Sequence, residues 1–217
     1  MTDVVLYSYW RSSAAYRVRA ALNIKRIDYR IEPVHLVRGG GEHRQPDYLA
    51  LNPQGLVPLL QDGDRRVSQS LAIIEYLEET RAEPALLPTD ASGRARVRSL
   101  AQVIACDIHP LQNLRVLKYL SEEIGVTDDQ RATWHLHWIR VGFEALEARL
   151  ADDPRTGAFC HGDTPGLADV LLIPQIYNAE RFGLDMSPYP TLGRINAACL
   201  AMDAFRHAAP EAQPDAA

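Results

Sequence analysis

The chain has no long apolar run and few cysteines, and these two features restrict the classes of protein to which it can belong. No stretch approaches the roughly 18 uninterrupted apolar residues of a membrane span, and the N-terminal sequence MTDVVLYSYW has neither the basic nor the apolar region of a signal peptide. The cysteines, Cys106, Cys160 and Cys199, are widely spaced and form no CxxC or Cys/His ligand pattern. We therefore expect a soluble cytoplasmic protein with reduced thiols, no membrane partner, no disulfide framework and no metal site.

Basic charge is also scarce. The chain has 23 Lys and Arg residues against 28 Asp and Glu, a net charge of −5, which gives no electrostatic footprint for nucleic acid. Local groups of arginine can still attract small anions. With 217 residues, 47% of them hydrophobic, the sequence can build one large core or two small ones.

The N-terminal part alternates strand-type and helix-type patterns. Short β-type runs precede and follow a segment with Val18, Ala21 and Leu22 on one helical face, which predicts a βαβ unit. Asp62-Gly63 then separates the two strands of a hairpin. The expected order is strand 4–7, helix 13–23, strand 29–36, helix 47–51, strands 56–60 and 65–67, and a helix from 71 onward.

The remainder reads as helical. Residues 83–89 contain two prolines and no periodicity, so they are expected to link a first domain, residues 1–82, to a second, residues 90–217. The final segment, HAAPEAQPDAA, is small and polar and is expected to be a surface tail. The helical period predicts helices over 92–125, 128–150, 166–182 and 191–205.

Two serines stand where the first strand gives way to the first helix. In YWRSSAAYRVRAAL, Ser12 and Ser13 lie at a helix N-terminus, where unpaired N–H groups and the positive end of the dipole stabilise an anion such as a thiolate. Serine is also among the commonest N-cap residues, so this pattern alone favours simple capping.

Two further segments of the same domain fit a peptide ligand. Val57-Pro58 starts a strand and is a candidate cis peptide, in which the backbone of Val57 would be exposed to an extended peptide. Gln69 and Ser70 open a helix and could bind a carboxylate through an amide, a hydroxyl and free N–H groups, although an ordinary N-cap has the same sequence.

Together these segments resemble the zeta-class glutathione transferases, the maleylacetoacetate isomerase family. The similarity is carried by YWRSSAAYRVRAALN, ALNPQGLVPLL, QSLAIIEYLEE, PALLP, ACDIHPLQNLRVL, GDTPGLADVLLIPQIYNAERF and PYPTLGRI, so it spans nearly the whole chain. It implies a thioredoxin-like N-terminal domain, an all-helical C-terminal domain, glutathione as cofactor and a homodimer.

The resemblance also implies roles for individual residues. Ser12 and Ser13 match the serines beside the glutathione sulfur, with Ser12 as the first choice for polarising it. The family's usual SSC motif is here Ser12-Ser13-Ala14, which excludes a mechanism that needs that cysteine. The residues matched to glutathione binding are Ser12, Ser13, His43, Val57, Gln69, Ser70, His109, Asn113 and Arg115.

Arginine side chains are expected to bind the carboxylates of the substrate. Their planar forks bind carboxylates in a bidentate way and stay charged. His109 and Arg115 resemble a pair found in the related maleylpyruvate isomerases, and Arg181 matches a carboxylate-binding arginine of the family. Arg11 is a weaker fourth choice for the same role.

The expected activity is glutathione-dependent cis-trans isomerisation of maleylacetoacetate to fumarylacetoacetate, in the breakdown of aromatic amino acids such as tyrosine. Three alternatives stay open. They are a maleylpyruvate isomerase of aromatic acid degradation, a transferase that conjugates or dehalogenates small haloacids, and a non-catalytic interaction module.

Three other patterns resemble sites but favour structural roles. His135 and His137 lie two residues apart, point in different directions on a helix and are expected at the surface. Asp169 stands where the N-terminal capping box of a buried helix is expected, with Gly166 in place of the family's Ser or Thr. Cys160 and His161 are adjacent, which seldom lets one side chain act as base for the other.

Overall fold

The computed structural model describes residues 4–216, and the chain divides into two compact units. One unit is Leu87–Leu200. The other combines the chain up to Leu86 with the segment from Ala201 onward. From the sequence, the segment from residue 201 onward was expected in the helical second domain. The contacts place it in the first unit instead.

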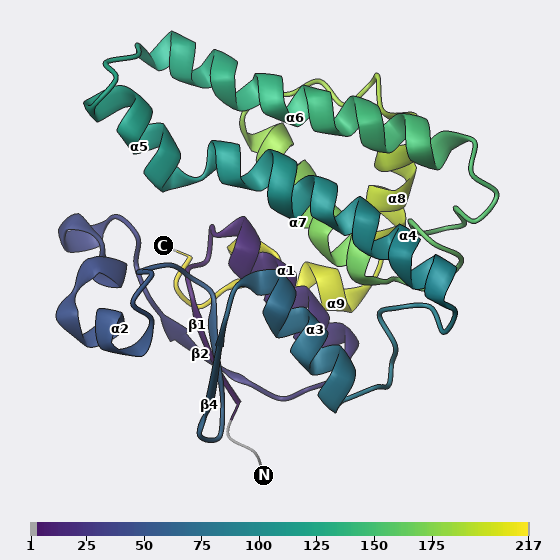
Figure 1. Cartoon of the computed structure of the whole chain (residues 1–217), viewed down its shortest axis with the longest axis horizontal. Helices are drawn as coiled ribbons and strands as arrows, with labels where there is room; N and C mark the ends of the chain where they lie inside the picture. The colour runs from purple at the N-terminus through teal and green to yellow at the C-terminus, as the bar shows by residue number, and fades with distance from the viewer. Residues whose placement is uncertain (1–3, 217) are drawn as a thin grey trace. The chain divides into compact units, whose positions relative to one another are not determined.

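A four-stranded mixed sheet forms the framework of the first unit (Figure 1). Its order is β2-β1-β3-β4; β1 pairs with β2 in parallel and with β3 antiparallel, and β3 pairs antiparallel with β4. The strands are β1 (Val4–Ser8), β2 (Arg30–Pro33), β3 (Leu59–Asp62) and β4 (Arg65–Ser68). The helical segments are α1 (Ser13–Ile24), η1 (Arg38–Gly40), η2 (Glu42–Arg44), α2 (Pro46–Leu51) and α3 (Ser70–Thr80).

The expected β-α-β-α-β-β-α order is confirmed. Helices α1 and α3 contact one another and bury apolar side chains such as Val18, Leu22 and Leu77. Leu6 of β1 and Leu60 of β3, the two central strands, are fully buried. Strand β2 is shorter than the predicted 29–36 and ends at Pro33, which pairs with Ser8, the last residue of β1.

The second unit is helical. Helix α7 is its centre, because most of its residues are buried, and it contacts α4 and α8. Apolar residues of α6, including Ile139 and Phe143, complete the core. The helices are α4 (Ala91–Gln102), η3 (Val103–Ile108), η4 (His109–Gln112), α5 (Leu114–Glu122), α6 (Asp128–Ala151), α7 (Leu167–Arg181) and α8 (Pro190–Leu200).

The helix predicted over 92–125 is interrupted. The chain passes from α4 through a π-helical segment, η3, and a 3-10 turn, η4, before α5 begins. Pro110 contributes, because it lacks an N–H and its ring obstructs a continuous helix. Gly142 of α6 allows a close approach here, since a Cβ at this position would lie 2.2 Å from Cδ1 of Ile108.

The predicted helix 191–205 also ends early. Helix α8 stops at Leu200, and a short helix, α9 (Asp203–Arg206), and a 3-10 turn, η5 (Pro210–Ala212), follow in the first unit. The expected surface tail, which begins at His207, is instead partly buried: Ala208 is fully enclosed, and Pro210 and Gln213 are buried. Helix α9 contacts α1.

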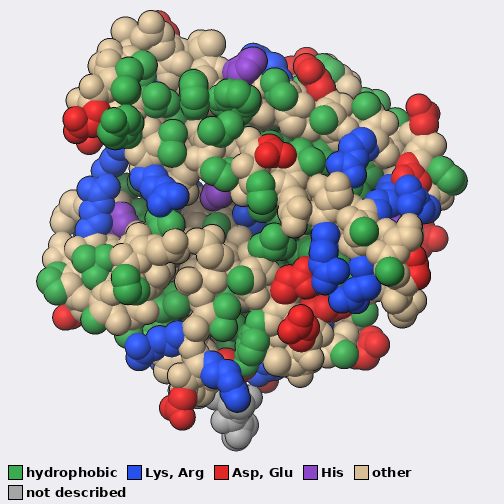
Figure 2. Space-filling model, viewed as in Figure 1, with side chains coloured by type: hydrophobic (Ala, Val, Ile, Leu, Met, Phe, Trp, Pro, Cys, Tyr) green, Lys and Arg blue, Asp and Glu red, His purple; other side chains and the backbone are tan. Residues whose placement is uncertain are grey.

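Hydrophobic side chains gather over α5 and α6 on the face shown in Figure 2. Helix α5 has no fully buried residue, and Leu114, Tyr119 and Ile124 are exposed in and just after it. Among the described residues, no helix is both long and apolar enough to cross a membrane.

Candidate glutathione and diacid site

The strand register brings three of the predicted glutathione segments to one edge of the sheet. Tyr7 pairs with Leu59, and Leu59 pairs with Ser68, so the end of β1, the start of β3 and the end of β4 lie together. Ser12 follows β1, Val57 precedes β3 and Gln69 follows β4. The first unit therefore places these residues around a common edge.

Ser12 is the N-cap of α1. Its Oγ accepts a hydrogen bond from the backbone N–H of Ala15 at 3.2 Å, and its own N–H donates to the carbonyl of Tyr9 at 2.9 Å. The hydroxyl donates to no other residue that the structure describes, so its proton can point at a ligand. The first turn, which starts at Ser13, contains no acidic residue to oppose an anion. Capping and anion binding are therefore compatible at Ser12.

The start of α3 has an unusual backbone. Gln69 precedes the helix with φ 71°, which is uncommon outside glycine and is typical of binding sites. Its Nε2 donates to Oε1 of Gln54 at 2.8 Å. Ser70 is buried, and its Oγ accepts a hydrogen bond from Nη1 of Arg17 at 3.3 Å. The sequence analysis did not identify Gln54 or Arg17 as neighbours of this position.

Val57 and His43 complete the predicted set in this unit. The Val57–Pro58 peptide bond is cis, the form considered from the sequence. The carbonyl of Leu56 accepts two hydrogen bonds, from Tyr48 Oη and Asn52 Nδ2, whereas the backbone of Val57 bonds to no other described residue. The main chain of Val57 is thus available to a peptide. His43 is buried.

The β1–α1 loop holds Arg11 beside aromatic rings. Its guanidinium lies 4.9 Å from the ring centroid of Trp10, and Nη2 donates weakly to Oη of Tyr9 at 3.4 Å. Arg11 is exposed. These contacts leave a cation at the same end of the sheet as Ser12.

In the second unit, three predicted residues surround the start of α5. His109 is half-buried in η4, and Asn113 caps α5 by accepting a hydrogen bond from the N–H of Arg115 at 3.1 Å. The Arg115 side chain is exposed. Asn113 therefore has a structural role as the N-cap of α5, and its glutathione contact stays a prediction.

Arg181 ends α7 and stacks on an aromatic pair. Its guanidinium lies 4.7 Å from the ring centroid of Phe182, whose ring lies 3.8 Å from that of His135. His135 Nε2 is 3.0 Å from Oδ1 of Asn178. The predicted surface position of His135 is wrong, because the residue is 2% exposed and fills the space beneath Phe182, whereas His137 is exposed.

Asp169 has the structural role expected of it. One carboxylate oxygen accepts from the N–H of Gly166 and the other from the N–H of Cys160, both at 2.8 Å. Burial raises the pKa of Asp169, and these hydrogen bonds oppose that shift. The carboxylate therefore fastens the preceding loop to α7.

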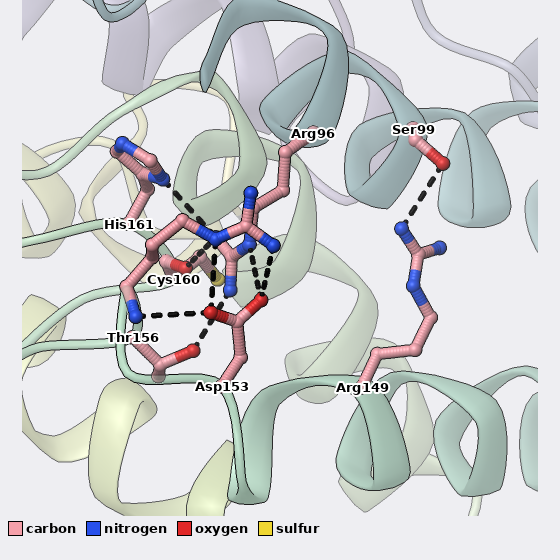
Figure 3. Close-up of polar contacts among 8 residues, drawn as sticks. Arg96, Ser99, Arg149, Asp153, Thr156, Cys160 and His161 are labelled. Atoms are coloured by element: carbon pink, nitrogen blue, oxygen red, sulfur yellow. Dashed lines mark hydrogen bonds and ion pairs between the residues drawn. The ribbon is translucent and has the colours of Figure 1, made fainter. Parts of the chain in front are cut away.

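Cys160 and His161 belong to a structural network around Arg96 (Figure 3). Arg96 Nη1 donates to the carbonyl of Cys160 at 2.7 Å and lies 3.2 Å from Nδ1 of His161. Burial raises the pKa of the Cys160 thiol well above its usual range, which removes it as a nucleophile. Among residues 4–216, no three His, Cys, Asp or Glu side chains are grouped to hold a metal ion.

A hollow at the opposite end of the sheet is lined by charged residues and does not include the predicted site. Arg81 there forms an ion pair with Asp62 at 2.8 Å, and Tyr76 donates to the same oxygen at 2.8 Å. Two of its charges, Asp62 and Arg81, are already paired with one another, so the helix N-termini at the other edge are the better anion site.

Comparisons with known proteins identify the family of the chain. Residues 11–80 match the model of the glutathione S-transferase N-terminal domain. A probable maleylacetoacetate isomerase of Vibrio cholerae is 52% identical over 100% of both chains, and a maleylpyruvate isomerase of a Ralstonia species is 50% identical over 98% of this chain and 99% of its own.

Solved structures give the same result. A holo maleyl pyruvate isomerase, described as a bacterial zeta-class glutathione S-transferase, is 50% identical with a TM-score of 0.95 over 98% of this chain and 100% of its own. A maleylacetoacetate isomerase of Methylobacterium extorquens AM1 with bound malonate and glutathione is 45% identical, with a TM-score of 0.94 over 98% and 99% of the two chains. The fold is that of a glutathione transferase. The chain belongs to the zeta-class, maleylacetoacetate isomerase family of these proteins.

Proposed function

We propose that the protein is a glutathione-dependent isomerase that converts maleylacetoacetate to fumarylacetoacetate. The observation that carries the proposal is the geometry of Ser12, whose hydroxyl caps α1 and still has its proton to donate. The full-length similarity to curated maleylacetoacetate isomerases supports the choice of reaction. A soluble, cytoplasmic homodimer is part of the same proposal, and light scattering of the purified protein tests the dimer.

The residues of the first unit fit glutathione. The free main chain of Val57 suits a cysteinyl backbone, and Ser70, with the Arg17 cation behind it, suits the γ-glutamyl carboxylate. His43 and Gln69 would contribute further contacts. When bound, glutathione supplies a thiolate that adds reversibly to the maleyl double bond, so that the bond can rotate, and it is released unchanged.

The chain's own residues would prepare and hold the reactants. Ser12 donates a hydrogen bond toward the sulfur, and Ser13 and the positive end of α1 stabilise negative charge there. Arg115, Arg181 and Arg11 bind the substrate carboxylates and the negative charge that develops on the keto oxygen. His109 orients the substrate beside Arg115. No proton, oxidant or reductant is consumed in such a cycle.

The first test is isomerisation of maleylacetone with and without glutathione. Catalysis that requires glutathione and leaves its concentration unchanged is expected. Consumption of glutathione or release of halide from haloacids, without isomerisation, would replace this proposal with a conjugating or dehalogenating transferase. Binding of glutathione with no reaction at all would favour the non-catalytic module.

Variants then test the residues. Ser12→Ala should lower kcat by at least about tenfold, because a hydrogen bond to a charged atom is lost. The change also removes an N-cap, so Asp90→Ala is the matched control: Asp90 caps α4 by accepting from the N–H of Gly93 at 2.8 Å.

Arg181→Ala should mainly raise KM for the diacid. Arg140→Ala, which replaces another exposed arginine, is its control. Unchanged kinetics in both site variants would refute the assignments.

Maleylpyruvate is the second substrate to test. The Ralstonia maleylpyruvate isomerase and the holo maleyl pyruvate isomerase are each 50% identical to the chain, close to the 52% of the Vibrio cholerae protein. The ratio of kcat/KM for the two diacids, measured on one preparation, decides between them. A ratio above about tenfold would identify the preferred substrate. It corresponds to a difference of about 1.4 kcal/mol in the binding of the two transition states.

A further inference from the structure

The C-terminal segment from Ala201 onward is bonded along α1. The hydroxyl of Tyr16 donates to the carbonyl of Phe205 at 3.3 Å, and Nδ2 of Asn23 donates to that of Ala204 at 2.9 Å. Gln213 braces the segment internally, because its Nε2 donates to the carbonyls of His207 and Ala209. Figure 1 shows this segment as the yellow chain beside α1. The end of the sequence is thus built into the unit that contains Ser12.

Arg19 connects this segment to the loop before α1. Its guanidinium is fully buried and donates to the carbonyl of Ala208 at 2.9 Å, to Oγ of Ser8 at 3.0 Å and to the carbonyl of Trp10 at 3.0 Å. Burial lowers the pKa of Arg19 to about 10, and the nearby carboxylate of Asp215 opposes that shift. Arg19 therefore remains a cation at neutral pH.

Asp215 holds the same loop from the other side. Its Oδ2 accepts a hydrogen bond from the backbone N–H of Trp10 at 3.0 Å. Its Oδ1 is buried and has no hydrogen-bond partner among the described residues. Both main-chain polar groups of Trp10 are thus held, the N–H by Asp215 and the carbonyl by Arg19. Trp10 lies two residues before Ser12, and Ser12 is itself bonded to the carbonyl of Tyr9.

We propose that Arg19 and Asp215 are positioning residues, through which the C-terminal segment fixes the β1–α1 loop and aims the hydroxyl of Ser12. This inference rests on the proposed function, in which Ser12 donates a hydrogen bond to the glutathione sulfur. A carboxylate so near an anion site would ordinarily oppose thiolate formation. The buried Arg19 cation offsets that charge, and the hydrogen bond to Trp10 is what Asp215 contributes.

Three variants test the inference. Asp215→Ala removes the acceptor for the Trp10 N–H, and Asp215→Asn keeps an oxygen acceptor without the charge. Asp203→Asn is the matched control, because Asp203 is an exposed carboxylate of the same segment that pairs with Arg206 and does not contact the loop. Amide hydrogen exchange at Trp10, kcat, and calorimetric binding of glutathione are measured for each.

Asp215→Ala should speed exchange at the Trp10 amide by roughly tenfold and lower kcat by a similar factor, as expected for one lost hydrogen bond. Asp215→Asn should recover most of both, and Asp203→Asn should match the parent chain. Equal exchange and kcat in Asp215→Ala and Asp203→Asn would overturn the inference, as would equal losses in the Ala and Asn variants of Asp215.

The measurements separate this inference from the proposed function. If the parent chain isomerises neither diacid, the proposed function fails, while Trp10 exchange and glutathione affinity still show whether Asp215 fixes the loop. If the parent chain is active and Asp215→Ala behaves as the control does, the proposed function stands and the positioning role fails.

Discussion

Arg17 of α1 donates a hydrogen bond to the hydroxyl of Ser70, the first residue of α3, at 3.3 Å, and both residues are buried. The contact joins the helix that begins beside Ser12 to the helix that begins beside Gln69. It also directs the hydroxyl proton of Ser70 away from Arg17, because the oxygen already accepts from a cation. A buried arginine behind a helix N-terminus makes this position strongly attractive to a carboxylate.

Ser70→Ala should therefore weaken glutathione binding. The loss of one hydrogen bond to a charged group corresponds to about 1.5 kcal/mol or more, roughly a tenfold rise in Kd. Titration calorimetry with glutathione measures the change. Ser92→Ala, an exposed serine in α4, should bind glutathione as the parent chain does. Equal affinity in the two variants would show that Ser70 does not contact the ligand.

The order of the first unit could be predicted from the sequence because its signals are local. The apolar period changes between strand and helix within a few residues, and Asp62-Gly63 marks the hairpin. Ser12, Gln69 and Ser70 could be proposed as site residues for the same reason, since each stands at a strand-to-helix boundary. Their grouping at one sheet edge follows from the register.

Contacts between distant residues could not be predicted. Arg17 and Ser70 are 53 positions apart, and Trp10 and Asp215 are 205 apart. The small, polar composition of the final segment predicted a surface tail, but Arg19 of α1 donates to the carbonyl of Ala208, and Ala208 and Gln213 are buried. His135 was misplaced likewise, because its partner Asn178 lies 43 residues away.

Arg96 should be a major contributor to the stability of the second unit. Its guanidinium donates to the carboxylate of Asp153, to the carbonyl of Cys160 and to the hydroxyl of Thr156, all within 2.9 Å (Figure 3). Arg96→Met leaves these groups without their donor and should lower the free energy of unfolding by roughly 2–3 kcal/mol. Urea unfolding measures the loss.

Arg149→Met is the control for Arg96. Arg149 makes an exposed hydrogen bond to Ser99 at 3.0 Å, also drawn in Figure 3, so its replacement should change stability by less than about 0.5 kcal/mol. Comparable losses from the two variants would mean that the Arg96 network is not a stabilising unit.

His135 should make stability depend on pH. Burial lowers the pKa of His135 below its usual value of 6.5, the Asn178 hydrogen bond raises it, and the Arg181 cation lowers it. The unfolded chain therefore takes up a proton at a higher pH than the folded chain. The contribution of His135 is complete above about pH 6.5 and is lost as pH falls toward the lowered folded pKa.

Urea unfolding between pH 8 and pH 5 measures this dependence. His135→Gln should reduce the loss of stability on acidification, and the exposed His137→Gln should leave it unchanged. Stability will still depend on pH in the His135→Gln variant, because His161 also has a lowered pKa. The main cause is burial, and the positive charge of Arg96 adds to it. A His135→Gln slope equal to that of the parent chain would contradict the prediction.

Gly166 offers a place to stabilise the protein. It is the N-cap of α7, with φ −128°, a conformation that any residue adopts, and it supplies only a backbone N–H to Asp169. Serine at this position would complete the capping box, because its hydroxyl could accept from the N–H of Asp169. Gly166→Ser should stabilise the chain by a few tenths of a kcal/mol from the cap, and by about 0.4–1 kcal/mol from reduced unfolded-state entropy.

Gly166→Ala separates the two contributions. Alanine also reduces the entropy of the unfolded chain but cannot cap, so the Ser variant should melt at a higher temperature than the Ala variant. A total gain near 1 kcal/mol corresponds to a rise in Tm of roughly 2–4 °C for a chain of this size. An Ala variant as stable as the Ser variant would mean that the Asp169 carboxylate, through its bonds to Gly166 and Cys160, already supplies all the capping that α7 uses.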